Sequence, residues 1–174
     1  AAQWQQFYAL KYEIETLRRN PSIAGYVITQ MADVHWEANG LLDMRRNPRV
    51  FHNVFSSINA DTVIVPRWER LSYWADETVK LDLHIAHGAG GSIEGASLQI
   101  RFGGGENLSV PKINAGSVLN VGQIELSIPE DDAPALMRVE FDLRSSDGLP
   151  IAKNSLDVAV HHRRSMKMSG RIWA

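Results

Sequence analysis

Apolar residues recur at every second position in several stretches of the last two-thirds of this 174-residue chain. Successive side chains of a strand point to opposite faces, so a period of two predicts β-strands with one face buried. Residues that favour turns, mainly glycine, proline, asparagine and aspartate, separate the stretches. The predicted strands are 79–85, 98–102, 124–128, 137–143 and 156–160, with an edge strand at 62–65 before Pro66.

Several short strands of this kind within about 100 residues are typical of an antiparallel β-sandwich of immunoglobulin-like type. The sequence therefore predicts a sandwich domain over residues 60–162. The chain contains no cysteine, which excludes a disulfide-pinned antibody domain and any thiolate chemistry. Residues 163–174 show no pattern, and we expect them to form a tail.

Residues 1–59 follow a different pattern. Apolar spacings of three and four predict an amphipathic helix over residues 2–19, and a second apolar stripe predicts a helix that begins at Pro48 and ends near Ser57. Between them, residues 25–31 show little alternation, as expected of a strand covered on both faces. This order predicts a helix–strand–helix unit. The apolar positions of the first helix are Trp4, Phe7, Leu10, Ile14 and Leu17.

Three ordered stretches resemble the end of a family 2 glycoside hydrolase, the family of β-galactosidases, β-glucuronidases and β-mannosidases. They are GYVITQMAD at 25–33, NGLLDMRRNPRVFH at 39–52 and PRWERLSYWADETVKLDLHIAH at 66–87. Thr29 stands where the family has a tryptophan, and Trp36 is the candidate aromatic platform in its place. The matching positions are Gly25, Gln30, Met31 and Asp33 in the strand, and Gly40, Arg46, Pro48 and Arg49 after it.

This resemblance implies a mainly β fold, an immunoglobulin-like antiparallel β-sandwich preceded by a helix–strand–helix remnant of a (β/α)8 barrel. It implies that the parent protein hydrolyses β-glycosides with retention, which requires two carboxylates about 5 Å apart. In the family these carboxylates lie on barrel strands that would precede Ala1. We therefore expect the chain to be inactive alone, to contain no catalytic residue, and to serve as a structural or accessory part.

The resemblance also implies substrate contacts in the intact parent, because barrel enzymes bind substrate beyond the C-terminal ends of the strands. Amides and carboxylates would bind sugar hydroxyls, and an indole would stack on a pyranose ring. The alternative is structural, with Asp33 capping the loop backbone and Trp36 packed beneath the helices. The candidate substrate-binding residues are Gln30, Asp33, His35, Trp36, Glu37 and Asn39.

Other motifs have simpler explanations. The histidines at 35 and 161–162 lack the spacing and third ligand of a metal site, so we expect no metal and no cofactor. The FGGGENL stretch at 102–108 lacks the lysine of a phosphate-binding loop and predicts a hairpin loop. Trp68, Tyr73 and Trp74 either seal an interdomain joint or bind sugar. The sugar-binding reading makes a stand-alone carbohydrate- or protein-binding sandwich the alternative function.

The expected partners follow from charge and apolar content. A net charge of −2 with mixed signs, and no long apolar run, predict neither a nucleic-acid nor a membrane partner. We expect the remainder of the catalytic domain and, in the parent, carbohydrate. Without them, Phe7, Val27, Ile28 and Phe55 would be exposed, which predicts homodimerisation or domain swapping through residues 1–58, or their packing on the sandwich. The sequence leaves open whether the compartment is the bacterial cytoplasm or the secreted space.

Overall fold

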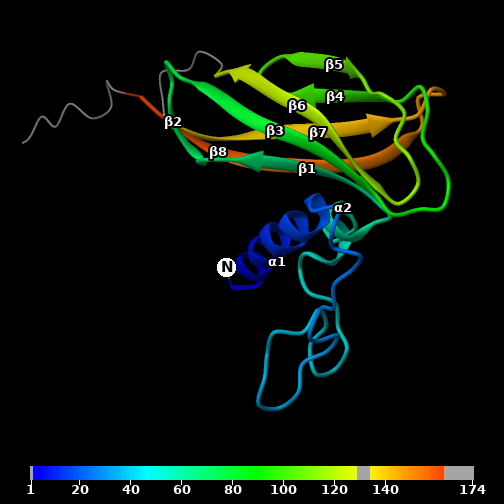
Figure 1. The fold of residues 1–174 in the computed structure, drawn as a ribbon. Helices are drawn as coiled ribbons and strands as arrows, with labels where there is room; N and C mark the ends of the chain where they lie inside the picture. The colour runs from blue at the N-terminus through cyan, green and yellow to red at the C-terminus, as the bar shows by residue number, and fades with distance from the viewer. Residues whose placement is uncertain (1, 129–133, 163–174) are drawn as a thin grey trace, which may run out of the picture.

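The fold is mainly β, as the sequence predicts. A computed structural model describes residues 2–128 and 134–162, which form two β-sheets with helical segments on one side (Figure 1). The predicted tail at 163–174 lies outside the described residues. The elements are α1 (Ala2–Arg19), the 3-10 helix η1 (His52–Val54), α2 (Ser56–Asn59), β1 (Thr62–Trp68), β2 (Ser72–Trp74), β3 (Thr78–His87), β4 (Ser97–Arg101), β5 (Gly105–Ser109), β6 (Ser117–Ser127), β7 (Ala135–Arg144) and β8 (Pro150–His161).

The two sheets enclose one apolar core. One sheet has the order β1-β3-β6 and the other the order β2-β8-β7-β4-β5. Neighbouring strands are antiparallel, except that β2 runs parallel to β8. Alternate residues of each strand point inward, such as Leu81 and Leu83 of β3 and Phe141 and Leu143 of β7, and all four are fully buried. This arrangement agrees with the predicted sandwich.

The six strands predicted for the sandwich are all present, and the structure adds strands there that the sequence pattern did not indicate. β1 is an edge strand, as Pro66 predicts, since a proline cannot donate a backbone hydrogen bond to a further strand. β5 is a correction, because we expected a loop over much of this stretch. It is an edge strand that pairs with β4 and has a mostly exposed surface, so its sequence shows no apolar alternation. β2, with only three residues, and the first half of β6 were also not predicted.

In the first third, α1 is confirmed over the predicted range, but the buried strand at 25–31 is wrong. No strand is assigned there, and the Val27 side chain is 90% exposed. A strand requires a neighbouring backbone to pair with, and among the described residues the nearest bridge to this segment is the isolated one between Ala32 and Leu42, just beyond its end. The second predicted helix is reduced to the short η1 and α2. The barrel remnant is therefore not confirmed.

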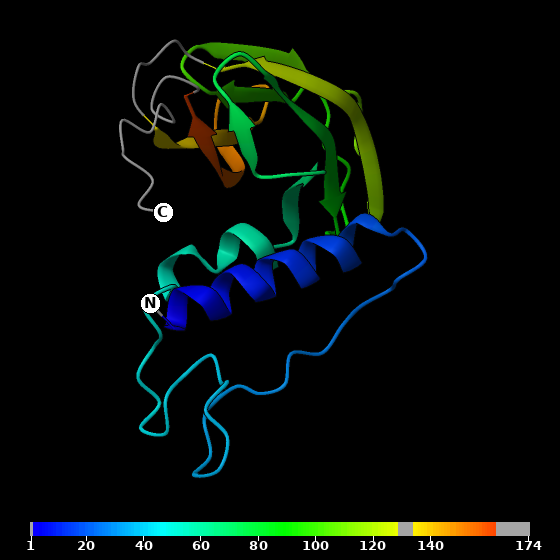
Figure 2. The ribbon, with the colours of Figure 1, turned by 90° about the vertical axis from the view of Figure 1, so that its left-hand side faces the viewer.

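The helical segments have a small core of their own. Phe7 and Ile14 of α1 pack with Phe51 and Ile58, and the Phe7 and Phe51 ring centroids are 5.6 Å apart. Phe7 is thus buried, contrary to the prediction that it would be exposed. α1 lies against the side of the sandwich at β1 and β8, while the segment between α1 and α2 extends away from it (Figure 2). The described chain therefore packs α1 on its own sandwich, whereas dimerisation stays a prediction.

Candidate functional site

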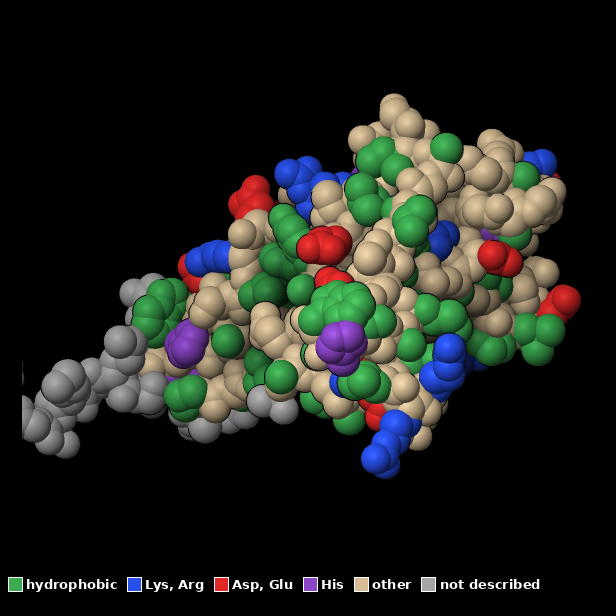
Figure 3. All heavy atoms as spheres, turned by 90° about the horizontal axis from the view of Figure 1, so that it is seen from below, with side chains coloured by type: hydrophobic (Ala, Val, Ile, Leu, Met, Phe, Trp, Pro, Cys, Tyr) green, Lys and Arg blue, Asp and Glu red, His purple; other side chains and the backbone are tan. Residues whose placement is uncertain are grey.

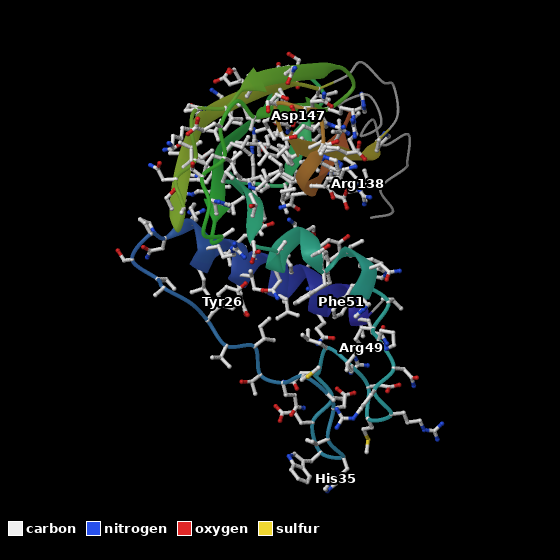
Figure 4. The ribbon with its side chains drawn as sticks, turned by 90° about the vertical axis from the view of Figure 1, so that its right-hand side faces the viewer. Tyr26, His35, Arg49, Phe51, Arg138 and Asp147 are labelled. Atoms are coloured by element: carbon white, nitrogen blue, oxygen red, sulfur yellow. The ribbon has the colours of Figure 1, made fainter. Side chains whose placement is uncertain are left out.

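The six predicted substrate-binding residues lie on one projecting loop, residues 30–40, which we call the distal loop. Figure 4 shows His35 at the end of this loop farthest from the sandwich, with Arg49 nearer to α1. Seen from that side, hydrophobic side chains lie next to acidic and basic ones on the surface (Figure 3). The distal loop is therefore accessible in the isolated chain, and no sheet positions it.

Asp33 holds the base of the distal loop together. Its Oδ1 atom accepts a hydrogen bond from the backbone N–H of Gly40 at 2.8 Å, and its Oδ2 atom forms an ion pair with Arg49. Arg49 also donates from Nε to the Gly40 carbonyl oxygen at 3.1 Å. Both carboxylate oxygens of Asp33 are thus engaged by Gly40 and Arg49, which is the geometry expected of the structural alternative.

Three of the other candidates form a polar cluster on the exposed side of the loop. Gln30 donates from Nε2 to the Asn39 Oδ1 atom at 3.1 Å, and Asn39 donates from Nδ2 to the Glu37 Oε1 atom at 3.1 Å. Two amides and a carboxylate are therefore adjacent and open to solvent. Such a cluster can donate to and accept from neighbouring hydroxyl groups.

The remaining two candidates are aromatic and lie at the end of the distal loop. The rings of His35 and Trp36 are nearly perpendicular, with centroids 4.0 Å apart. Trp36 is 75% exposed, so it does not pack beneath the helices as the structural alternative required. An exposed indole beside a polar cluster can stack on a sugar ring while the cluster binds its hydroxyls. The structure thus joins Gln30, Glu37 and Asn39 in one hydrogen-bonded cluster and His35 with Trp36 in one aromatic pair, while Asp33 holds the base of the loop.

Within residues 2–128 and 134–162, no group of three or more His, Asp or Glu side chains is placed to hold a metal ion. In the same ranges, no helix is both long and apolar enough to cross a membrane.

A cleft lies between α1 and the outer face of the five-stranded sheet, and we call it the α1 cleft. Its volume is about 1310 Å³. Trp4, Tyr8 and Tyr12 of α1 line one side, together with Trp68 at the end of β1. Strands β7 and β8 line the other side, and Figure 4 shows Arg138 there, facing the helices.

Lys11 and Asn154, which line the α1 cleft, belong to a buried polar cluster. Lys11 forms an ion pair with Glu15 and donates from Nζ to the Asn154 Oδ1 atom at 2.7 Å. Asn154 donates from Nδ2 to Glu15 at 2.7 Å and to the Ile64 carbonyl oxygen at 2.6 Å. Burial lowers the pKa of Lys11 and raises the pKa of Glu15, and the attraction between the two groups opposes both shifts. This cluster joins α1 to β8 and β1.

This cleft was not predicted from the sequence. Trp4 was expected in the core stripe of the first helix, and Tyr8 and Tyr12 were not among the candidate residues. The available signal was the spacing of four residues between these aromatics, which places them on one face of a helix. Of the three aromatics proposed to bind sugar or seal a joint, Tyr73 is buried in the core, whereas Trp68 borders the cleft.

Solved structures with a similar fold include those of an exo-chitosanase. No protein-family model matches the chain, and no curated protein sequence matches it. A variant of the exo-chitosanase CsxA from Amycolatopsis orientalis, in complex with PNP-β-D-glucosamine, matches with a TM-score of 0.60 at 13% identity. The match covers 91% of this chain and 19% of that chain.

Two further structures of CsxA give the same picture. A crystal structure of the Amycolatopsis orientalis exo-chitosanase matches with a TM-score of 0.59 at 12% identity. A structure of the exo-β-D-glucosaminidase CsxA with inhibitors also has a TM-score of 0.59, at 13% identity. Each covers 91% of this chain and 19% of that chain. This chain therefore spans about a fifth of the enzyme's length, and at such low identity the likeness shows a shared fold alone.

Proposed function

We propose that this chain is the C-terminal accessory part of a family 2-like glycoside hydrolase. The sandwich braces a catalytic domain, and the distal loop faces the sugar-binding cleft of that domain. The parent hydrolyses β-glycosides with retention, using two carboxylates on earlier barrel strands. The chain contributes no catalytic residue, and it is inactive without its parent.

The observation that carries this proposal is the extent of the structural match. The match covers 91% of the chain, whereas the 59 residues before the sandwich make up about a third of its 174 residues. The sandwich alone cannot account for such coverage. The matched part of the chain therefore extends into residues 1–59. A match restricted to the sandwich, which is a common fold, would not support a proposal about a glycosidase.

The exposed apolar surface supports the same proposal. Within residues 20–54, large hydrophobic side chains are exposed to an extent unusual for so short a segment. Contiguous exposed apolar surface commonly marks a site of association. The partner we propose is the rest of the catalytic domain, whose strands would supply the backbone pairing that residues 25–31 lack here. The exposed side chains are Ile23, Val27, Met31, Val34, Trp36, Met44, Val50 and Val54.

In the proposed assembly the distal loop contacts substrate and performs no chemistry. Trp36 stacks on a sugar ring, and Gln30 and Asn39 hydrogen-bond hydroxyl groups that lie beside it. Glu37 accepts a hydrogen bond from Asn39 and keeps the amide oriented. Asp33 sets the position of the loop through Arg49 and Gly40.

The test is complementation with the polypeptide encoded directly upstream of this chain. The chain alone should not hydrolyse nitrophenyl β-glycosides above the blank, and the combined polypeptides should hydrolyse one of them. In the active complex, Trp36→Ala should raise KM more than it lowers kcat. Met44→Ala is the matched control, because it changes an exposed apolar residue of the same segment that lies outside the distal loop. It should not raise KM as Trp36→Ala does.

Three results would contradict the proposal. The first is turnover by the chain alone that copurifies with it. The second is an upstream reading frame without a barrel that carries two glutamates at strand ends. The third is a Trp36→Ala complex with unchanged KM. An upstream frame without a barrel would instead favour the alternative from the sequence, a stand-alone carbohydrate- or protein-binding sandwich.

A further inference from the structure

One side of the α1 cleft is lined by aromatic side chains that belong to neither the sandwich core nor the core of the helical segments. Trp4, Tyr8 and Tyr12 are spaced by four residues and lie on one face of α1. They are 40%, 47% and 61% exposed, whereas Phe7 and Ile14 on the core face of the helix are buried. Exposed aromatic rings in a row are unusual on a surface helix. Their common location beside a cleft suggests that a ligand covers them.

The opposite side of the cleft carries polar groups held rigidly on strands. Arg138 of β7 forms two hydrogen bonds with Asp157 of β8, at 2.7 and 3.0 Å. On the same outer face, Arg101 of β4 donates to Glu140 of β7 at 3.0 Å. Tyr8 spans the cleft, since its hydroxyl donates to the Asp157 Oδ2 atom at 3.4 Å. These partners are cross-strand neighbours, so the sheet fixes their spacing.

The charges on this side are paired with one another, which decides the class of ligand. Arg138 is neutralised by Asp157, and Arg101 is neutralised by Glu140. A strongly anionic or cationic ligand would have to break these pairs. A neutral ligand rich in hydroxyl groups can accept from the guanidinium N–H groups and donate to the carboxylates without breaking them.

The size and shape of the α1 cleft narrow the class of ligand further. Pockets for small molecules usually have volumes of about 300–1,000 Å³, and the α1 cleft, at about 1310 Å³, is larger than one monosaccharide needs. Tyr12 and Trp68 lie at one part of it, with ring centroids 6.3 Å apart, and Trp4 and Tyr8 lie further along the helix. Several stacking positions along one cleft suit an extended chain of rings.

We propose that the α1 cleft is a binding site for a neutral oligosaccharide, separate from the distal loop. Sugar rings stack on Tyr8, Tyr12 and Trp68, while the Arg138–Asp157 pair binds their hydroxyl groups. This site requires no catalytic domain and operates whether or not the proposed function holds. In a glycosidase it would hold a polymeric substrate near the enzyme.

The experiment is a titration of the full chain followed by tryptophan fluorescence and by calorimetry. The probes are cellohexaose as a neutral oligosaccharide, glucosamine hexamer as a cationic one and polygalacturonate oligomer as an anionic one. Cellohexaose should bind in the micromolar to millimolar range and more tightly than both charged probes. Tyr12→Ala should weaken its binding by about tenfold, the effect of losing one contact worth about 1.4 kcal/mol.

Matched variants make the outcome specific. Tyr12 is mostly exposed, so its truncation should not unfold the chain. Leu136→Ala changes an exposed apolar residue of β7, the strand that carries Arg138, and should leave binding unchanged. Asp157→Asn removes one charge of the ion pair and should weaken binding while increasing the relative affinity for the anionic probe.

Four results would overturn the proposal. One is no binding of cellohexaose at millimolar concentration. A second is preferred binding of a charged probe, and a third is equal loss of binding in Tyr12→Ala and Leu136→Ala. The last is a dimer, measured by sedimentation, that Tyr12→Ala dissociates, since the aromatic face would then be covered by a second copy. Failure of the complementation experiment leaves this site unaffected, because the titration uses the chain alone.

Discussion

The buried contact between α1 and the sandwich allows a quantitative test of how the helical segment is held. Lys11 and Glu15 are only 6% and 3% exposed, and with Asn154 they form the polar connection from α1 to β8. The Glu15 Oε2 atom has no hydrogen-bond partner among the described residues. Replacing Lys11 by methionine therefore leaves a buried carboxylate with Asn154 as its remaining side-chain donor.

The expected cost of Lys11→Met follows from that uncompensated charge. Breaking a buried ion pair by removing one partner typically costs about 3–5 kcal/mol. That is a large part of a total stability of about 5–15 kcal/mol. Glu15→Leu should cost a similar amount, because it leaves the ammonium group of Lys11 buried. The double variant removes both charges, and its stability should lie within about 1 kcal/mol of the original or above it.

The effects of the two substitutions should therefore be strongly non-additive. If they were independent, the double variant would lose about 6–10 kcal/mol, the sum of the two single losses. Urea unfolding, followed by circular dichroism and by tryptophan fluorescence, measures each free energy. Lys112→Met is the matched control, because Lys112 forms an exposed ion pair with Glu94 and its loss should change stability by less than about 0.5 kcal/mol.

Two outcomes would refute this reasoning. If the single and double variants are additive, then Lys11 and Glu15 do not compensate each other. If Lys11→Met costs no more than Lys112→Met, then the pair is not buried in solution and α1 is not docked on β8 as described. Hydrogen exchange in α1 separates these two cases, because undocking exposes the whole helix to solvent.

Three further predictions concern single positions. A Cβ atom at Gly40 would lie 2.5 Å from the backbone nitrogen of Asp33, so Gly40→Ala should open the distal loop and abolish hydrogen-exchange protection there. Gly25→Ala, which meets nothing within 4 Å, should preserve that protection, and equal effects of the two variants would contradict this. Burial lowers the pKa of His84 below its ordinary value of 6.5. At pH values between the lowered pKa and 6.5, the folded chain therefore binds fewer protons than the unfolded chain. The free energy of unfolding should rise with pH across that window, and His84→Gln should reduce the rise in urea midpoints measured from about pH 5 to about pH 8. Trp36→Ala should leave the free energy of unfolding, measured with urea, unchanged within error because the side chain is mostly exposed. A decrease of more than about 1 kcal/mol in this free energy would show that the side chain packs against the rest of the protein.

Local periodicity was sufficient to predict the sandwich and the first helix. In β3 and β7 each inward residue faces one core, so the alternation in the sequence directly records burial. The same holds for Phe7 and Ile14 of α1, whose spacing records the side of the helix that packs. β5 could not be found this way, because an edge strand with exposed faces leaves no apolar pattern.

The candidate site was predicted in part. The polar and aromatic residues of the distal loop are adjacent in sequence, so their proximity in space required little from the fold. Their setting was not predictable, since the sequence indicated a buried strand before them and the structure has none. A β-like sequence becomes a strand only when another backbone supplies the missing hydrogen bonds.

The sequence by itself determined the strand periodicity of the sandwich, the extent of α1 and the composition of the distal loop. Each of these depends on residues that are near one another along the chain. Only the tertiary structure decided that Lys11 and Glu15 are buried against Asn154, and that Tyr8 and Tyr12 face Arg138 and Asp157 across a cleft. Those contacts join residues more than a hundred positions apart, and no local pattern encodes which distant surfaces meet.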